Sequence, residues 1–201
     1  EVLPIKVPAG VSIMGYEMRT TFVGPNIDDD GGNGVGKCIP YTGNAGNHYT
    51  SGTPNNEVAM FLMNDSTTFR GFTLRGMVGT VWGTQVSGHT EPTVKGVCFR
   101  LDPEGQINLK SPFIQNCCAI NDTGGGIYCN GSDGGGRYKS FTCNDFTQIN
   151  SDGFALFATN KGRIEAVSVF TYYCHVGYTT THGGIIRSAN GNNSYGHYGA
   201  V

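Results

Sequence analysis

Apolar residues alternate with polar ones in short runs along the chain. Ile5 and Val7 form one such run, Val11 and Ile13 form the next, and a Pro-Ala-Gly turn separates them. A period of two is typical of β-strands, because successive side chains of a strand point to opposite faces. Glycine, asparagine and proline separate the runs, so the pattern predicts an all-β chain of many short strands. Later runs lie near residues 58–63, 97–101, 127–129, 154–157 and 164–170.

Four phenylalanines mark a loose repeat. Phe72, Phe113, Phe141 and Phe170 each belong to a similar short run, and they are 41, 28 and 29 residues apart. Such a repeat is what the stacked coils of a solenoid produce. We therefore expect a β-solenoid, a parallel β-helix of roughly five coils with surface loop insertions and about 4.8 Å between coils. The alignment also predicts that the four phenylalanines are buried and stack in one column along the axis.

A β-sandwich is the less favoured architecture, because its hairpins need tight two-residue turns and few are present. No segment resembles a linker between globular units, so we expect a single β-helix domain over residues 1–201. The chain starts at Glu1 within the strand pattern and ends at Val201 without a capping segment. We therefore expect it to be a fragment of a longer chain.

Two segments interrupt the repeat and are predicted to be surface loops. Residues 28–56 are rich in glycine, asparagine and proline, and residues 81–91 account for the long first spacing between phenylalanines. Binding residues of rigid scaffolds usually lie in such insertions. The candidate glycan or receptor contacts there are Tyr41, His48, Tyr49, Trp82 and His89. Trp82 has a second interpretation, as a cap on the core.

Composition supports β structure and suggests that other protein covers part of the surface. Glycine is abundant at 32 residues, whereas leucine occurs only six times. Charged residues make up 14% of the chain, against about 25% in typical domains. Together with the uncapped ends of a solenoid, this predicts a homo-oligomer, most simply a homotrimer. A net charge of −2 argues against a nucleic-acid partner, and no long apolar run indicates membrane insertion.

The potential metal ligands do not have the spacing of known metal motifs. The seven cysteines form no Cys-x-x-Cys pair and are odd in number, which indicates neither a zinc site nor a complete disulfide framework. We expect most of them to be reduced and buried, with Cys117 and Cys174 in one column of the repeat. Asp28, Asp29 and Asp30 lack the ligand spacing of an EF-hand, so a solvated turn is the preferred interpretation.

A β-helix can also be a polysaccharide lyase or glycosidase, which needs two carboxylates at a groove, or a basic residue with a cation. The candidate acids and bases are Asp122, Asp145, Asp152, Glu165, His175 and His182. The aspartates lie in turn contexts where a capping role is sufficient, and Glu165 is expected to point outward. His175 and His182 have no acidic or second-ligand partner at metal spacing, so a surface or subunit contact is preferred. We therefore expect no catalytic residue, cofactor or metal site.

Three segments near the C-terminus resemble a known group of proteins. They are NDFTQINSDGFALF (144–157), VSVFTYYCHVGY (167–178) and GGIIRSANGNNSYGHYGAV (183–201), and VPAGVSIMGYEMRTTFVGP (7–25) resembles a first coil. They look like segments of virion structural proteins of tailed bacteriophages, especially those that infect marine cyanobacteria. Those proteins are similar to right-handed parallel β-helices of the pectate-lyase type. The resemblance spans nearly the whole chain and is weak through residues 28–56 and 81–96.

The resemblance implies a tail, tailspike or tail-fibre component of the virion, commonly a homotrimer that contacts other tail proteins. It also implies assembly without disulfides in the host cytoplasm. No agreed catalytic motif belongs to this group, so no catalytic residue is carried over. We expect a non-catalytic structural module with a potential role in host attachment. The alternative is a β-helical depolymerase, a lyase or glycosidase that acts on host surface polysaccharide.

Overall fold

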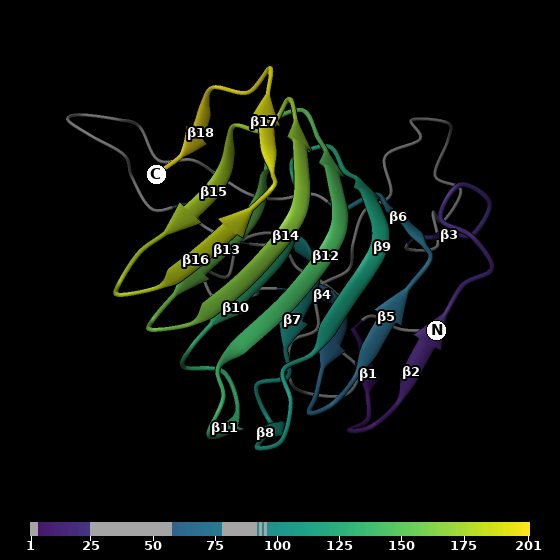
Figure 1. The fold of residues 1–201 in the computed structure, drawn as a ribbon, viewed down its shortest axis with the longest axis vertical. Coiled ribbons are helices and arrows are strands. Elements are labelled where there is room, and N and C mark those ends of the chain that lie inside the picture. The colour runs from purple at the N-terminus through teal and green to yellow at the C-terminus, as the bar shows by residue number, and fades with distance from the viewer. Residues whose placement is uncertain (1–3, 25–57, 78–91, 93, 95) are drawn as a thin grey trace, which may run out of the picture.

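The computed structural model describes residues 4–24, 58–77, 92, 94 and 96–201. These residues form strands and turns without a helix, which confirms the all-β prediction. Most strands belong to two sheets that face each other (Figure 1), and the neighbouring strands of each sheet are parallel. The colour in Figure 1 changes steadily across both sheets, because the strand order of each follows the chain.

The strands of the first sheet are β1 (Ile5–Val7), β4 (Val58–Met63), β7 (Gly96–Leu101), β10 (Gly125–Asn130), β13 (Phe154–Thr159), β15 (Val176–Thr180) and β18 (Tyr198–Ala200). The strands of the second sheet are β2 (Ser12–Met14), β3 (Phe22–Val23), β5 (Thr68–Arg70), β6 (Thr73–Arg75), β9 (Phe113–Ile120), β12 (Ser140–Ile149), β14 (Arg163–Tyr172), β16 (Ile185–Ala189) and β17 (Asn192–Ser194). A separate small pair consists of β8 (Gln106–Ile107) and β11 (Gly135–Gly136).

Each long strand of the second sheet bends at one residue with a positive φ. These residues are Asn116 in β9, Asp145 in β12 and Ser168 in β14, and the strand register places them opposite one another. Gly71 and Asn190 have positive φ at the corresponding places next to β5 and β16. Glycine, asparagine and aspartate adopt this left-handed conformation most readily, which suits them to a repeated bend.

The bend changes which alternate residues face the interior. In β12 the buried positions are Phe141 and Cys143 before the bend, but Phe146 and Gln148 after it. One residue in the left-handed conformation shifts the alternation by one position, as a β-bulge does. Each long strand therefore consists of two arms, and both arms direct side chains into the core.

Apolar columns fill the interior between the sheets. In the first sheet one column runs from Ile5 through successive strands to Tyr178: Ile5, Phe61, Phe99, Ile127, Leu156 and Tyr178. In the second sheet Phe69 stacks between Ile13 and Ile114. The ring of Phe69 lies 4.5 Å from that of Phe61 and 5.0 Å from that of Phe99, centroid to centroid, which joins the two sheets.

The predicted column of four phenylalanines is wrong. Phe141 and Phe72 are buried, as expected. Phe141 pairs with Ile164, however, and Phe170 pairs with Thr147 and Asn192 on the partly exposed side of the sheet. Phe113 is only half-buried, in register with Thr68 and Thr142.

The cause of the error is the bend together with an unequal number of residues between paired positions. Phe141 lies on the first arm of its strand, whereas Phe170 lies beyond the bend, where the alternation is reversed. The hydroxyls of Ser111 and Ser140 form a hydrogen bond between adjacent coils over 29 residues, whereas His175 and His197 meet over 22. A fixed spacing between phenylalanines therefore does not match the observed register.

Asp65 fixes the turn that leads into the second sheet. Its carboxylate accepts hydrogen bonds from the backbone N–H groups of Asn108 (3.1 Å), Leu109 (3.0 Å) and Lys110 (2.8 Å) of the next coil. The bond from Lys110 contributes most to lowering the pKa of Asp65, which falls to about 2. One buried carboxylate thus satisfies three backbone donors between coils.

We predict that Phe141→Ala lowers the free energy of unfolding by about 3–5 kcal/mol, the usual cost of removing a buried aromatic side chain. Phe141 is fully buried, whereas Phe113 is half-buried. Phe113→Ala is the matched control and should cost clearly less. Urea denaturation followed by circular dichroism measures both changes, and an equal loss in the two variants would contradict the described register.

We also predict that Asp65 stabilises the fold in a pH-dependent way. The pKa of Asp65 is lowered from 3.8 to about 2, so its stabilising contribution is complete above about pH 4 and is lost as the pH falls toward 2. Asp65→Asn should therefore lower Tm at pH 7, and the difference from wild type should shrink between pH 4 and 2. Thermal unfolding at several pH values tests this, with the exposed Asp122→Asn as control. A Tm difference independent of pH would contradict it.

Candidate functional site

The glycan-contact candidates lie outside the described residues. These are Tyr41, His48, Tyr49, Trp82 and His89. Asp28, Asp29 and Asp30 lie outside them as well. The candidate acids and bases, in contrast, all have described positions.

Among the carboxylates considered for glycoside cleavage, Asp122 and Asp152 are neighbours, because the backbone N–H of Asp152 donates to the carbonyl oxygen of Asp122 (3.2 Å). Asp145 and Glu165 lie apart from them, within β12 and β14. Asp145 is exposed at the bend of β12, and Glu165 in β14 lies 3.4 Å from Arg187 in β16. Asp145 is separated from Asp152 by the second arm of β12, whose four residues extend about 13 Å. The two carboxylates of a glycosidase are about 5–9.5 Å apart. Asp145 and Asp152 therefore do not form such a pair across this arm.

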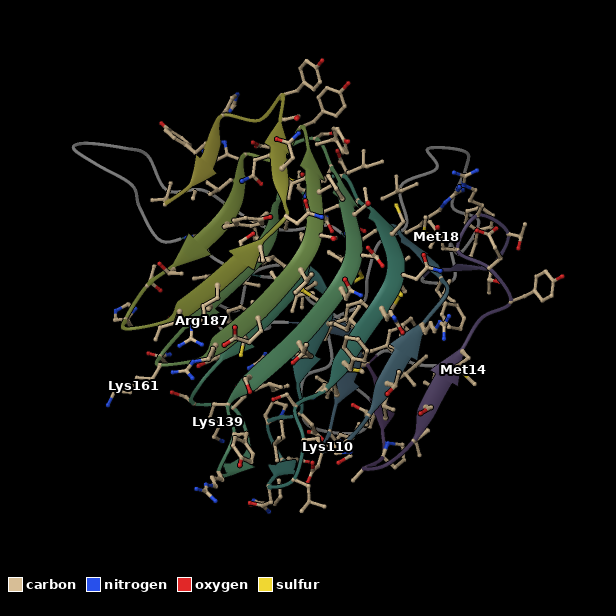
Figure 2. All side chains as sticks on the ribbon, in the orientation of Figure 1. Met14, Met18, Lys110, Lys139, Lys161 and Arg187 are labelled. Carbon is tan, nitrogen blue, oxygen red and sulfur yellow. The ribbon has the colours of Figure 1, made fainter. Side chains whose placement is uncertain are left out.

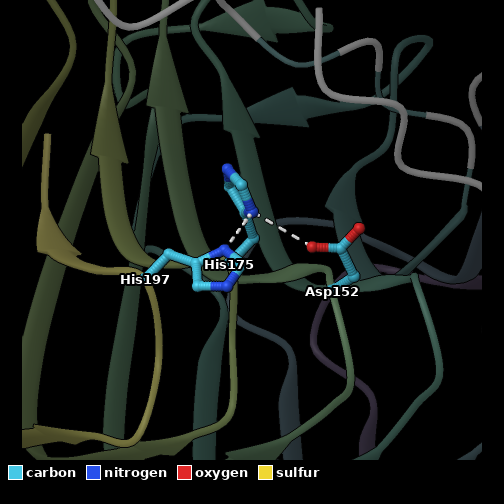
Figure 3. A group of neighbouring side chains, drawn as sticks. All are labelled: Asp152, His175 and His197. Carbon is cyan, nitrogen blue, oxygen red and sulfur yellow. Dashed lines mark hydrogen bonds and ion pairs between the residues drawn. The ribbon is translucent and has the colours of Figure 1, made fainter.

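Asp152 instead lies beside two histidines. Asp152 is in the turn before β13, His175 is in the turn before β15, and His197 immediately precedes β18 (Figure 3). Nδ1 of His175 lies 3.0 Å from Oδ1 of Asp152 and 2.8 Å from Nδ1 of His197. One potential ligand atom from each of the three residues lies within 4.8 Å of the others. We call this group the His–Asp cluster.

The His–Asp cluster corrects the expectation that His175 has no acidic or second-ligand partner. The three donors come from turns far apart in the sequence rather than from a local motif, and the prediction of no metal site stays a prediction. His182 is not part of the cluster. It is exposed in the turn at the far end of β15, where its backbone has positive φ.

Strand register brings the cluster together. Val176 of β15 pairs with Phe154 of β13 and with Tyr198 of β18, so the residues just before these strands stack along the axis. The turn that connects β12 to β13 is one residue longer than the turn that connects β14 to β15. Asp152 lies in this longer turn, and its carboxylate contacts the side chain of His175.

The cluster is accessible from solvent at one side. The side chain of His175 is 17% exposed and that of Asp152 is 51% exposed, and His197 is also exposed. The rings of His175 and His197 are nearly perpendicular at 83°, with centroids 4.7 Å apart. Three donors of this kind can hold a metal ion, and the contact between Asp152 and His175 can also orient an imidazole as a general base.

A short sequence repeat indicates two of the three residues of this cluster. Tyr-x-His-x-Gly begins at Tyr173 and again at Tyr195, 22 residues later. The two tyrosines have positive φ, and their exposed rings stack with centroids 5.6 Å apart and an angle of 22°. The 22-residue period identifies His175 and His197 as neighbours, whereas Asp152 lies outside the repeat.

The described cysteines are unsuited to nucleophilic chemistry. Burial raises the pKa of Cys143 and Cys129 to about 12 and that of Cys117 to about 11, and the thiolate is the reactive form. Their predicted burial is confirmed for five of the six described cysteines. The predicted shared column of Cys117 and Cys174 is wrong, because Cys117 pairs with Phe146 and Cys174 lies beyond the end of β14.

A row of basic residues follows the turns that lead into the second sheet. Lys110, Lys139 and Lys161 precede β9, β12 and β14, and they lie along one margin of the molecule (Figure 2). Lys139 donates to the carbonyl oxygens of Asp133 (2.6 Å) and Gly135 (3.1 Å). Lys110 and Lys161 are exposed, so this margin presents positive charge to solvent.

Comparisons with protein-family models, with curated proteins and with solved structures found no match to this chain. Among the described residues, no helix is long and apolar enough to cross a membrane.

Proposed function

We propose that the chain is a right-handed parallel β-helix of roughly five coils. Its strands alternate between two sheets, and each pairs in parallel with the corresponding strand of the preceding coil. This alternation is what a continuous solenoid requires. Connections between parallel strands of one sheet are right-handed in nearly all proteins, which supports the proposed hand.

This β-helix is proposed to serve as a structural module of a phage tail, tailspike or tail fibre. The observation that carries the proposal is the apolar column from Ile5 to Tyr178, which continues through six strands of the first sheet. A stack of this kind gives a stiff scaffold, as expected of a component that bears load. The proposed location in the virion and the proposed contacts with other tail proteins rest on the sequence resemblance to tail proteins.

Association into a homotrimer is part of the proposal. Met14, Tyr16 and Phe22 are exposed apolar side chains on the first coil, and Tyr16 is 97% exposed. Apolar groups in such positions are commonly covered by another chain. Three-fold association would also cover the open edge of the solenoid.

Host attachment is proposed to occur through the two insertions at residues 28–56 and 81–91, with Trp82 as a stacking residue. The basic margin of Lys110 and Lys161 lies on the described scaffold and adds electrostatic attraction for anionic surface polysaccharide. In this proposal the stacked strands form the rigid scaffold, and the surface groups contact the host polysaccharide.

A depolymerase is the second candidate, and the contact of 3.0 Å between Asp152 and His175 is the observation that favours it. A histidine oriented by a carboxylate is a common general base. The structural module remains the preferred proposal, because neither Asp145 nor Glu165 belongs to this cluster, and Asp122, whose backbone carbonyl accepts from Asp152, contributes no ligand atom to it.

The two functions predict different results with host polysaccharide. If the protein is non-catalytic, incubation with purified host capsule or lipopolysaccharide yields no new reducing ends and no unsaturated products. Binding should persist in Asp145→Asn and decrease in Trp82→Ala, measured by surface plasmon resonance. Depolymerisation by the wild type that is abolished in Asp152→Asn would overturn the structural proposal in favour of the enzyme.

The trimer is tested by light scattering on the untagged protein at micromolar concentration. We predict a mass three times that of the 21.4 kDa chain, which falls when Tyr16→Lys places a charge on the exposed first coil. Arg137→Glu, also an exposed change of charge but at a distant turn, is the control and should leave the trimer intact. A monomer in the wild type would contradict the proposed association.

A further inference from the structure

We propose that the His–Asp cluster of Asp152, His175 and His197 binds a divalent transition-metal ion of the Zn²⁺ class. This inference concerns the described corner of the fold and does not depend on the proposed function. Two imidazoles and one carboxylate are a common ligand set for Zn²⁺, and the exposed side leaves room for water as a further ligand. Imidazole donors favour Zn²⁺, Ni²⁺ and Cu²⁺ over Mg²⁺ and Ca²⁺, which prefer oxygen ligands.

The distances in the cluster are those of donors around one ion. Zn²⁺ binds imidazole nitrogen and carboxylate oxygen at about 2.0–2.2 Å, so two donors at adjacent coordination positions are about 2.8–3.6 Å apart. The contacts of His175 Nδ1 measure 3.0 Å to Asp152 Oδ1 and 2.8 Å to His197 Nδ1. In Figure 3 both contacts meet at the ring of His175, which lies between the other two side chains.

Nδ1 of His175 can form a full hydrogen bond with only one of its two neighbours. A neutral imidazole nitrogen either donates or accepts a hydrogen bond. If Nδ1 of His175 carries the proton and donates to Asp152, it has no lone pair with which to accept a hydrogen bond from His197. If it accepts from the N–H of His197, it carries no proton to donate, and the carboxylate oxygen of Asp152 lies 3.0 Å from an unprotonated nitrogen. A cation located among the atoms attracts all three, which is the arrangement that the geometry favours.

The ion would connect three neighbouring strands at the C-terminal end of the first sheet. Its three ligands lie in the turns that lead into β13, β15 and β18, which are successive strands of the first sheet. β18 is exposed at all three positions and pairs with β15 through Tyr198 and Ala200. Bound metal therefore links the edge strand to the two strands before it and should raise the stability of this end of the sheet.

The test uses untagged protein that has been stripped of metal with a chelator, followed by thermal unfolding with Zn²⁺, Ni²⁺, Mg²⁺ or Ca²⁺ alone. At a Zn²⁺ concentration about 100 times Kd, we expect Tm to rise by about 5–10 °C, because an ion that binds only the folded state stabilises a domain of this size by that amount. Ni²⁺ should also raise Tm, whereas Mg²⁺ and Ca²⁺ should not. Calorimetric titration then gives Kd and the number of ions bound.

Two variants remove ligands and one serves as the matched control. His197→Ala and Asp152→Asn should weaken Zn²⁺ binding at least about tenfold, and both change partly or fully exposed side chains, so the fold is expected to persist. His182→Asn removes an exposed histidine from the far end of β15, retains a residue suited to positive φ, and should bind Zn²⁺ like wild type. Circular dichroism confirms folding of each variant.

The proposal is overturned if Zn²⁺ leaves Tm unchanged, or if His197→Ala and wild type respond equally. X-ray absorption at the zinc edge provides a readout independent of stability. We expect two imidazole nitrogens at about 2.0–2.1 Å together with oxygen ligands. A spectrum with oxygen ligands only would also contradict the assignment.

Discussion

A single left-handed residue in each long strand of the second sheet determines which side chains enter the core. Asn116, Asp145 and Ser168 hold this conformation in three neighbouring strands, and the parallel hydrogen bonds keep them in register. The bend lets one strand direct apolar residues inward from both of its arms, such as Phe141 and Phe146. A coil with a different bend position would place polar side chains against its neighbours' core. The whole stack therefore depends on bend and register together.

Alternation along the sequence predicts the strands well but not their pairing. Most of the expected runs are strands of the structure, because a half-buried strand requires a period of two. The pairing of Phe141 with Ile164 could not be predicted from matching phenylalanines, since Asp145 and Ser168 reverse the alternation and resemble ordinary polar turn residues. Coil length also varies, so a repeat aligned on one residue type drifts out of register.

The His–Asp cluster was missed for a related physical reason. Its ligands are far apart in sequence and become neighbours only after the coils stack, whereas motif searches look for local spacing. The Tyr-x-His-x-Gly repeat identifies His175 and His197, but the position of Asp152 depends on one additional residue in its corner. The turn that connects the two sheets is thus both a structural element of the fold and the place where distant polar groups meet. Asp65 likewise connects residues that are far apart in the sequence, but its carboxylate accepts hydrogen bonds from backbone N–H groups rather than from side chains.

The register of the stack is the central claim, and a disulfide trap tests it most directly. Cys118 of β9 pairs with Thr147 of β12, and both are half-buried on the same side of the sheet. Facing residues of adjacent strands have the Cα separation that a disulfide needs, about 4.4–6.8 Å. Mild oxidation of folded Thr147→Cys should therefore yield a cross-link between positions 118 and 147, detected by peptide mass spectrometry. Thr142→Cys faces Phe113 instead and should leave Cys118 reduced. A cross-link to position 142, or one to position 147 that forms only after denaturation, would contradict the described register.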